Sequence, residues 1–282
     1  MSYRIVVDSC CEIPEAYLGD EHFISVPLEL QVGDLRIKDD ETFDQLDFLA
    51  KVAACPECPR SSCPDPETYM KAYASDVERI YVITLSSKLS GSYNSAVLAA
   101  DLYEEEYEEE YGPRKIHVID SMTASAGETQ IALKLLELES GNLTFEQIVP
   151  LIDAYRDSVS TYFVIDNLET FIKNGRIHGV KAAVATTLSV KPVLAGEDGD
   201  IVQLGQALGM KKGINKMIEI INASGKDMSG RRIIISNCNC RDRAEYIASK
   251  LAVTYPNVEI IHEDMRGVSS LYANDGGVIV TL

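Results

Sequence analysis

A serine-rich turn is the part of this sequence whose residue types most clearly suggest chemistry. Five serines and one glycine fall within residues 85–95, between an apolar segment (79–84) and a helical one (94–103). A strand-to-helix turn of this kind gathers backbone N–H groups and hydroxyls at the positive end of the helix dipole. These donors favour an anionic ligand, either a carboxylate or a phosphate. The structural alternative is that Ser90 or Ser92 only caps the helix.

Acidic and hydroxyl side chains also end two other apolar segments. Asp8-Ser9 ends the segment 3–7, and Asp120-Ser121 ends the segment 115–119. Strands that alternate with helices form right-handed βαβ units, and ligands bind at the carboxyl ends of their parallel strands. We therefore expect these polar residues to lie at one edge of a mostly parallel sheet.

The alternation of strands and helices predicts an N-terminal α/β domain over residues 1–159. Pro27 indicates an edge or a bend in its second strand, and Thr42 is the expected cap of a helix that runs through Ala53. The strands are expected at 3–7, 23–30, 79–84 and 115–119. The helices are expected at 11–18, 42–53, 65–74, 94–103 and 145–158, and a further helix follows the small residues 123–127 and ends at Glu139.

The pattern changes after residue 160 and predicts a second, smaller α/β domain over 160–282. Segments 188–194 and 201–204 flank the five-residue turn 196–200, which is typical of a β-hairpin. The other strands are expected at 161–165, 232–236, 258–262 and 278–282, and the helices at 211–223 and 241–255.

Composition excludes several classes of protein. The 282 residues carry a formal net charge of −18, which argues against a general nucleic-acid binder and against adsorption to anionic lipid. No apolar run approaches the ~20 residues that span a bilayer. Because the N-terminus reads directly as a strand, we expect no signal peptide and a cytoplasmic location.

Two other functions remain open from the residues alone. Cys10, Cys11, Cys55, Cys58 and Cys63 could form a zinc or redox site if their loops converged. A serine of the turn 86–95 could be the nucleophile of an enzyme that acts on a small anion, although no G-x-S-x-G motif or partner histidine is evident. No P-loop sequence is present, which argues against nucleotide hydrolysis.

Several further motifs stand in order along nearly the whole chain. They are Asp8-Ser9, Ser61-Ser62-Cys63-Pro64, Asp120-Ser121 with Gly127, Phe163-Val164-Ile165-Asp166-Asn167-Leu168 and Leu188-Ser189-Val190. The most specific motifs are the serine turn and the pairing of Gly175-Arg176-Ile177 with Lys191-Pro192. Together these motifs resemble the DegV family of bacterial lipid-binding proteins.

This resemblance implies a DegV-like fold, in which two α/β domains enclose an apolar tunnel for one long-chain fatty acid. The carboxylate is then expected at the domain junction, on hydroxyl and N–H groups. The resemblance also implies a carrier without catalytic residues, metal or cofactor, which presents its fatty acid to a partner kinase. By position, the expected ligand-binding residues are Ser61, Ser62, Ser90, Gly91, Ser92 and Tyr272.

Two departures from the family pattern concern the head group of the ligand. Ser61-Ser62-Cys63-Pro64 stands where the family has Thr-Ser-Gln-Pro, so the hydroxyls remain and the glutamine does not. Tyr272 aligns with the family's histidine, and His262 lies on the preceding strand. A tyrosine hydroxyl donates a hydrogen bond but brings no positive charge near neutral pH. The sequence therefore predicts a carboxylate site with less positive charge than is usual in the family.

Overall fold

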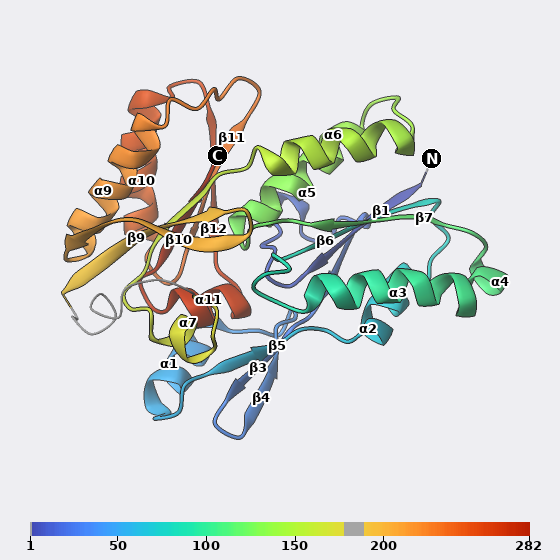
Figure 1. The fold of residues 1–282 in the computed structure, drawn as a ribbon, viewed down its shortest axis with the longest axis horizontal. Helices are drawn as coiled ribbons and strands as arrows, with labels where there is room; N and C mark the ends of the chain where they lie inside the picture. The colour runs from blue at the N-terminus through green and yellow to red at the C-terminus, as the bar shows by residue number, and fades with distance from the viewer. Residues whose placement is uncertain (1, 178–188) are drawn as a thin grey trace.

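A four-stranded parallel sheet forms the N-terminal half of the chain. The computed structural model describes residues 2–177 and 189–282. The strand order is β2 (Phe23–Val26), β1 (Tyr3–Asp8), β6 (Arg79–Thr84) and β7 (Lys115–Asp120), and neighbouring strands all run parallel. This confirms the predicted α/β class with a parallel N-terminal sheet (Figure 1).

Helices cover both faces of this sheet, because its strands are apolar on both sides. Ile5 and Val7 face α5 (Ala126–Glu139) and α6 (Phe145–Asp157), whereas Val6 faces α2 (Pro66–Tyr73) and α3 (Ser92–Glu106). This alternation is the two-residue period of a strand. The carboxyl ends of β1, β6 and β7 are thereby held at one edge, where their polar residues follow.

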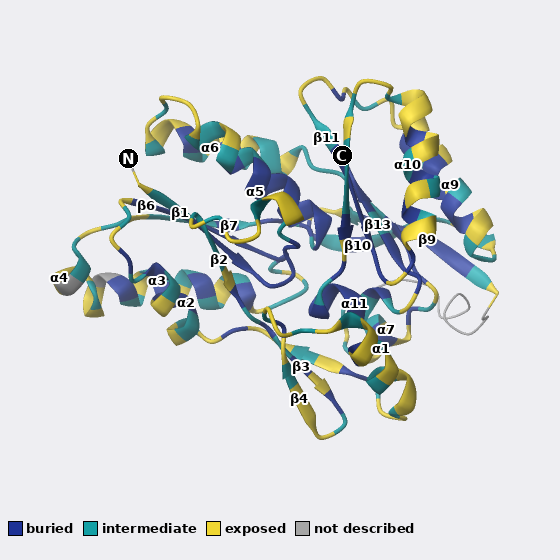
Figure 2. Cartoon of the chain, turned by 180° about the vertical axis from the view of Figure 1, so that it is seen from behind, coloured by how far each residue is buried: buried dark blue, intermediate teal, exposed yellow. Residues whose placement is uncertain are grey.

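A six-stranded mixed sheet forms the C-terminal half. Helices α9 (Met210–Ala223) and α10 (Arg241–Thr254) pack on one face, and α5 contacts the other. Figure 2 shows α5 as a largely buried helix between the two sheets. The strand order is β10 (Asp200–Leu208), β9 (Val190–Glu197), β8 (Thr161–Val164), β13 (Val278–Thr281), β11 (Arg232–Asn237) and β12 (Glu259–Asp264).

We propose residues 1–159 and 160–282 as the two domains. All strands of the parallel sheet precede residue 160, and all strands of the mixed sheet follow it. The long buried helix α5 belongs to the first part by sequence and packs on both sheets, so the parts share an extensive apolar contact.

A small antiparallel sheet was not predicted. The expected strand 23–30 is divided at Pro27, where the sequence indicated an edge or a bend: residues 23–26 belong to the parallel sheet, and the chain leaves that sheet at Pro27, which lacks the N–H that a ladder needs. Its second part, β3 (Glu29–Val32), pairs with β4 (Leu35–Lys38) and β5 (Arg60–Ser62). Strand β5 carries Ser61, so this sheet positions part of the expected site.

Two local predictions are also corrected. Helix α1 (Gln45–Ala54) is capped by Asp44, whose side chain accepts the N–H of Asp47, and not by Thr42. The turn between β9 and β10 is Asp198-Gly199 and not five residues, since both residues adopt the positive φ that a tight hairpin needs. Residue 188, the first of the predicted strand 188–194, lies outside the described residues.

The remaining elements are short. They are η1 (Glu15–Tyr17), α4 (Glu108–Tyr111), α7 (Glu169–Lys173) and α11 (Gly267–Ala273). Over residues 2–177 and 189–282, no helix is both long enough and apolar enough to cross a bilayer.

Candidate functional site

A cavity of about 270 Å³ lies at the junction of the three sheets. Its walls come from the turn after β6, from β5, from the strands β8 to β10 and from α11. Most of the lining is apolar and deeply buried, with side chains that include Leu28, Leu85, Phe163, Ile165, Ile201 and Val268. Such a cavity removes an apolar ligand from water and binds it through the hydrophobic effect.

The lining also carries hydroxyl groups, of which those of Thr123, Ser125, Thr161 and Ser269 are buried. Ser61, Ser62, Ser90, Gly91 and Tyr272 all line the cavity, so five of the six predicted ligand residues are brought together. Unlike the apolar wall, all five are partly or largely exposed to solvent. The cavity thus combines an apolar interior with a polar, accessible mouth.

The serine turn is held by its own backbone and by Asp8. The N–H groups of Leu89 and Ser90 donate to the carbonyl of Ser86, and the N–H of Leu85 donates to Asp8 Oδ2 at 2.9 Å. The hydroxyl oxygen of Ser90 accepts the N–H of Ser92 at 3.2 Å, which leaves its own O–H available as a donor. The turn is therefore rigid and still able to bind an acceptor at the mouth.

Ser92 is placed differently from the other predicted ligand residues. It is completely buried at the start of α3, and its hydroxyl donates to Asp8 Oδ2 at 2.6 Å. The phenol of Tyr69 lies 2.5 Å from the same hydroxyl. Ser92 is not among the residues that line the cavity. Its hydrogen bond to Asp8 instead connects the start of α3 to the end of β1. The N-cap position itself is Gly91, without a side-chain cap.

Tyr272 reaches the mouth from α11. Its ring lies 4.8 Å from that of Phe171, centroid to centroid, and its hydroxyl lies 3.2 Å from Ser61 Oγ. Helix α11 is fixed by Asp39, whose carboxylate accepts the N–H groups of Gly267 and Val268 at 2.8 Å each. A Cβ on Gly267 would lie 2.6 Å from Asp39 Cγ, so the close approach requires glycine.

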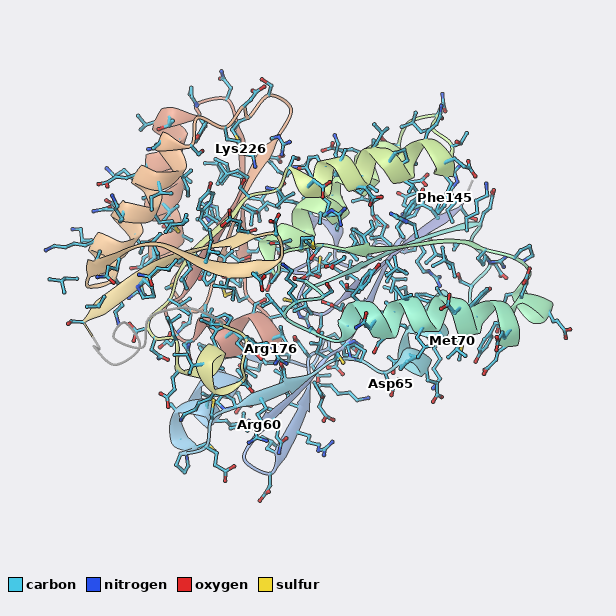
Figure 3. The ribbon with its side chains drawn as sticks, in the orientation of Figure 1. Arg60, Asp65, Met70, Phe145, Arg176 and Lys226 are labelled. Atoms are coloured by element: carbon cyan, nitrogen blue, oxygen red, sulfur yellow. The ribbon has the colours of Figure 1, made fainter. Side chains whose placement is uncertain are left out.

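Arg176 is a cavity-lining residue to which the sequence analysis gave no role. It follows α7 and lies near α11 (Figure 3), and its guanidinium donates to the carbonyl of Asn174 at 2.7 Å. The only feature of the sequence that pointed to Arg176 as a site residue was the motif Gly175-Arg176-Ile177. Among the described lining residues it is the only cation, so it supplies positive charge that Tyr272 cannot.

The hairpin tip closes another part of the lining. Gly199 and Asp200 line the cavity beside Met122, and the carbonyl of Gly199 accepts the hydroxyl of Ser86 at 2.8 Å. Lys88 forms an ion pair with Asp200 at 2.8 Å. The C-terminal sheet is thus attached directly to the serine turn, so each domain contributes to one cavity.

The alternative sites gain no support from the geometry. Cys10 and Cys63 line the cavity, whereas Cys11, Cys55 and Cys58 do not. Within the described ranges, no group of three or more His, Cys, Asp or Glu side chains is arranged to hold a metal ion. None of the described histidines lines the cavity, so the serines there have no histidine base. His178 lies outside the described residues.

The polar groups behind the cavity wall are unusual in being acidic and buried. Asp8, Glu12 and Glu128 are each at most 2% exposed. Burial raises the pKa of Asp8 to about 6 and that of Glu12 to about 7, and it raises the pKa of Glu128 well above its usual range. These acids are conspicuous in the structure, but of the three only Asp8 had been assigned to the edge of the sheet from sequence.

Comparisons with known proteins agree with this architecture. The family profile described as an uncharacterised protein of the DegV family matches residues 2–281. A DegV domain-containing protein of Streptococcus gordonii is 33% identical over 283 residues, covering 99% of this chain and 98% of the relative. A DegV family structure from Ruminococcus gnavus, refined with vaccenic acid, has a TM-score of 0.94 at 43% identity and covers 100% of both chains.

One solved structure also carries a functional name. The fatty acid kinase (Fak) B3 protein of Streptococcus pneumoniae, loaded with linoleic acid, has a TM-score of 0.89 at 30% identity. The match covers 100% of this chain and 99% of that one. With a family profile over its whole length and relatives above 30% identity, the chain belongs to the DegV family.

Proposed function

We propose that this protein binds one long-chain fatty acid in the cavity and presents it to a partner kinase. The observation that carries this proposal is a single cavity with an apolar interior and a mouth of hydroxyl groups. The fatty-acid-bound structures from R. gnavus and S. pneumoniae support it, and the name of the latter supports the kinase partner.

The carboxylate is placed at the mouth, on Ser61, Ser62, Ser90, Gly91 and Tyr272. A carboxylate leaves water only if hydrogen bonds replace its hydration, and several charge-assisted bonds serve this purpose. The Ser90 hydroxyl is free to donate, and Arg176 adds a positive charge nearby. The acyl chain contributes the larger share of affinity, about 0.8 kcal/mol for each buried CH₂.

In this proposal the protein is a carrier and not an enzyme, and the fatty acid is its only small ligand. None of the described histidines lines the cavity beside the serines, and a kinase partner would supply the chemistry. All seven cysteines are free thiols, which is consistent with a reducing compartment, and we propose the cytoplasm.

Two measurements test the proposal. Denaturing extraction of protein purified from cells, followed by mass spectrometry, should release one long-chain fatty acid per chain. Delipidated protein should regain a higher melting temperature with sodium oleate and a smaller increase with oleyl alcohol, which lacks the carboxylate. Absence of both an extracted acyl species and a melting shift would refute fatty-acid binding.

A further inference from the structure

Three buried carboxyl groups stand directly behind the wall of the cavity. Asp8 ends β1, Glu12 lies in the following loop, and Glu128 lies in the first turn of α5. Their exposures are 0%, 2% and 0%. Acids this deeply buried are rare unless they are paired with cations, because burial penalises the charged form.

Asp8 and Glu12 each hydrogen-bond to a residue that lines the cavity. Asp8 accepts the N–H of Leu85 at 2.9 Å, and Glu12 accepts the hydroxyl of Ser125 at 2.6 Å. These two bonds connect the acids directly to the wall of the cavity.

Glu128 interacts with Asp8 and with the lining residue Cys10. Neither of its carboxyl oxygens makes a hydrogen bond of normal geometry with the described residues. An ionised carboxylate without partners would be very costly here, so Glu128 keeps its proton. Its protonated form faces the Asp8 carboxylate and favours the charge there.

Positive charge is scarce around the group. In the described part of the chain, the one cation facing it is Arg266, whose guanidinium is directed to Asp39 at 3.9 Å and whose backbone N–H points to Glu12. The other titratable groups around these three acids are Cys10, Cys11, Asp39, Tyr69, Cys238 and Glu263. All of these groups are neutral or negative, so none of them stabilises an additional negative charge in the cavity.

We propose that Asp8 and Glu12, with Glu128 as their protonated neighbour, form a proton-binding site coupled to the cavity, so that a carboxylate ligand is bound together with a proton taken up by these acids. This inference rests on the proposed fatty-acid binding. A carboxylate at the mouth repels the ionised forms of Asp8 and Glu12 through a poorly polarisable wall, and protonation removes that repulsion. Since the pKa of Asp8 is about 6 and that of Glu12 about 7, both acids can take up a proton near neutral pH.

Reciprocity then requires tighter binding at lower pH. For delipidated protein and sodium oleate below its aggregation concentration, we expect the affinity to rise about five- to tenfold from pH 8 to pH 6. Calorimetry at pH 7 in two buffers with different ionisation enthalpies should show uptake of about 0.5–1 proton per ligand. Oleyl alcohol should bind without proton uptake.

One variant locates the proton on the protein. Glu12→Gln keeps the size of the side chain and its ability to accept the Ser125 hydroxyl, and it should remove most of the uptake at pH 7. Glu67→Gln, the same change at an exposed acid of α2, should leave the uptake unchanged. The carbon-13 shift of [1-¹³C]oleate bound to the unmodified protein shows independently whether the proton is on the ligand. If the proton is on the protein, this shift should remain that of an ionised carboxylate between pH 6 and pH 8.

The outcomes separate this inference from the proposed function. Oleate binding with no proton uptake overturns the proton site and leaves fatty-acid binding intact. A bound oleate that is itself protonated, or uptake that persists in Glu12→Gln, also overturns it. Failure of oleate to bind at any pH overturns the proposed function first, and the proton site with it.

Discussion

The hydroxyl of Ser61 lies 3.2 Å from that of Tyr272, although 211 positions separate them in the chain. Ser61 comes from the small sheet near the N-terminus and Tyr272 from the last helix, so this contact joins the two ends of the sequence at the mouth of the cavity. One of the two hydroxyls donates to the other, and the remaining proton is available to a ligand.

Removing this pair should weaken carboxylate binding. Tyr272→Phe keeps the ring contact with Phe171 and deletes only the hydroxyl, so we expect an affinity loss of about 0.5–1.5 kcal/mol with little change in melting temperature. A double-mutant cycle with Ser61→Ala, measured by titration with oleate, should show that the two losses are not additive. Additive losses would mean that the two hydroxyls act on the ligand independently.

Tyr272→His provides the complementary test. It restores the residue type that the resemblance leads one to expect and adds a group that can be positively charged. Oleate affinity should therefore be maintained or increased relative to the unmodified protein. A clear loss of affinity would show that the tyrosine has a role that an imidazole cannot fill.

Ser90 should matter more for ligand binding than the serines of the helix that follows it. Ser90→Ala removes a free hydroxyl donor at the mouth, and we expect it to weaken oleate binding by about 1–3 kcal/mol without unfolding the protein. Ser95→Ala is the matched control, because Ser95 lies in the first turn of α3 and does not line the cavity. Equal affinities for the two variants would place the carboxylate elsewhere.

The protein should be more stable in mildly acidic than in mildly alkaline solution. The folded pKa values of Asp8 (about 6) and Glu12 (about 7) lie above the usual carboxyl range, so folding favours their protonated forms. That stabilisation is complete below about pH 4 and is lost as the pH rises through both folded values. Glu128 keeps its proton in the folded protein and ionises when the chain unfolds, so it adds to this loss. Urea unfolding of ligand-free protein should therefore show the free energy of unfolding falling by more than about 4 kcal/mol from pH 5 to pH 8.

The same pH series on Glu12→Gln tests the cause. This variant lacks Glu12, whose folded pKa is about 7, so its unfolding free energy should change less between pH 6 and pH 8. A slope as steep as that of the unmodified protein would assign the pH dependence to other groups.

Gly267 should not tolerate a methyl group. An added Cβ would lie 2.6 Å from both Asp39 Cγ and Leu30 Cδ1, and the completely buried Asp39 cannot withdraw without losing its bonds to α11. We expect Gly267→Ala to cost about 1–3 kcal/mol of unfolding free energy and to lower oleate affinity by displacing α11 with Tyr272. Gly205→Ala, where the nearest atoms lie at 3.8 Å, should be close to neutral in both measurements.

Much of the fold could be predicted because most of its elements are long and locally specified. The apolar strands of the parallel sheet and the helices that follow them repeat with clear periods, and both halves of the chain were assigned to the correct class. The small sheet was missed because its strands span three or four residues, too few for a period to emerge.

The sequence by itself determined the serine turn, the hydroxyls at 61 and 62 and the tyrosine at 272, because these are matters of residue type and position along the chain. Tertiary structure alone decided which hydroxyls line the cavity. Ser90 and Ser92 look equivalent in the sequence, yet Ser90, in the turn before α3, lines the cavity, whereas Ser92, the first residue of α3, donates to Asp8. It also decided that Asp8, Glu12 and Glu128 meet behind the wall, since burial and proximity of charges arise only when distant segments pack together.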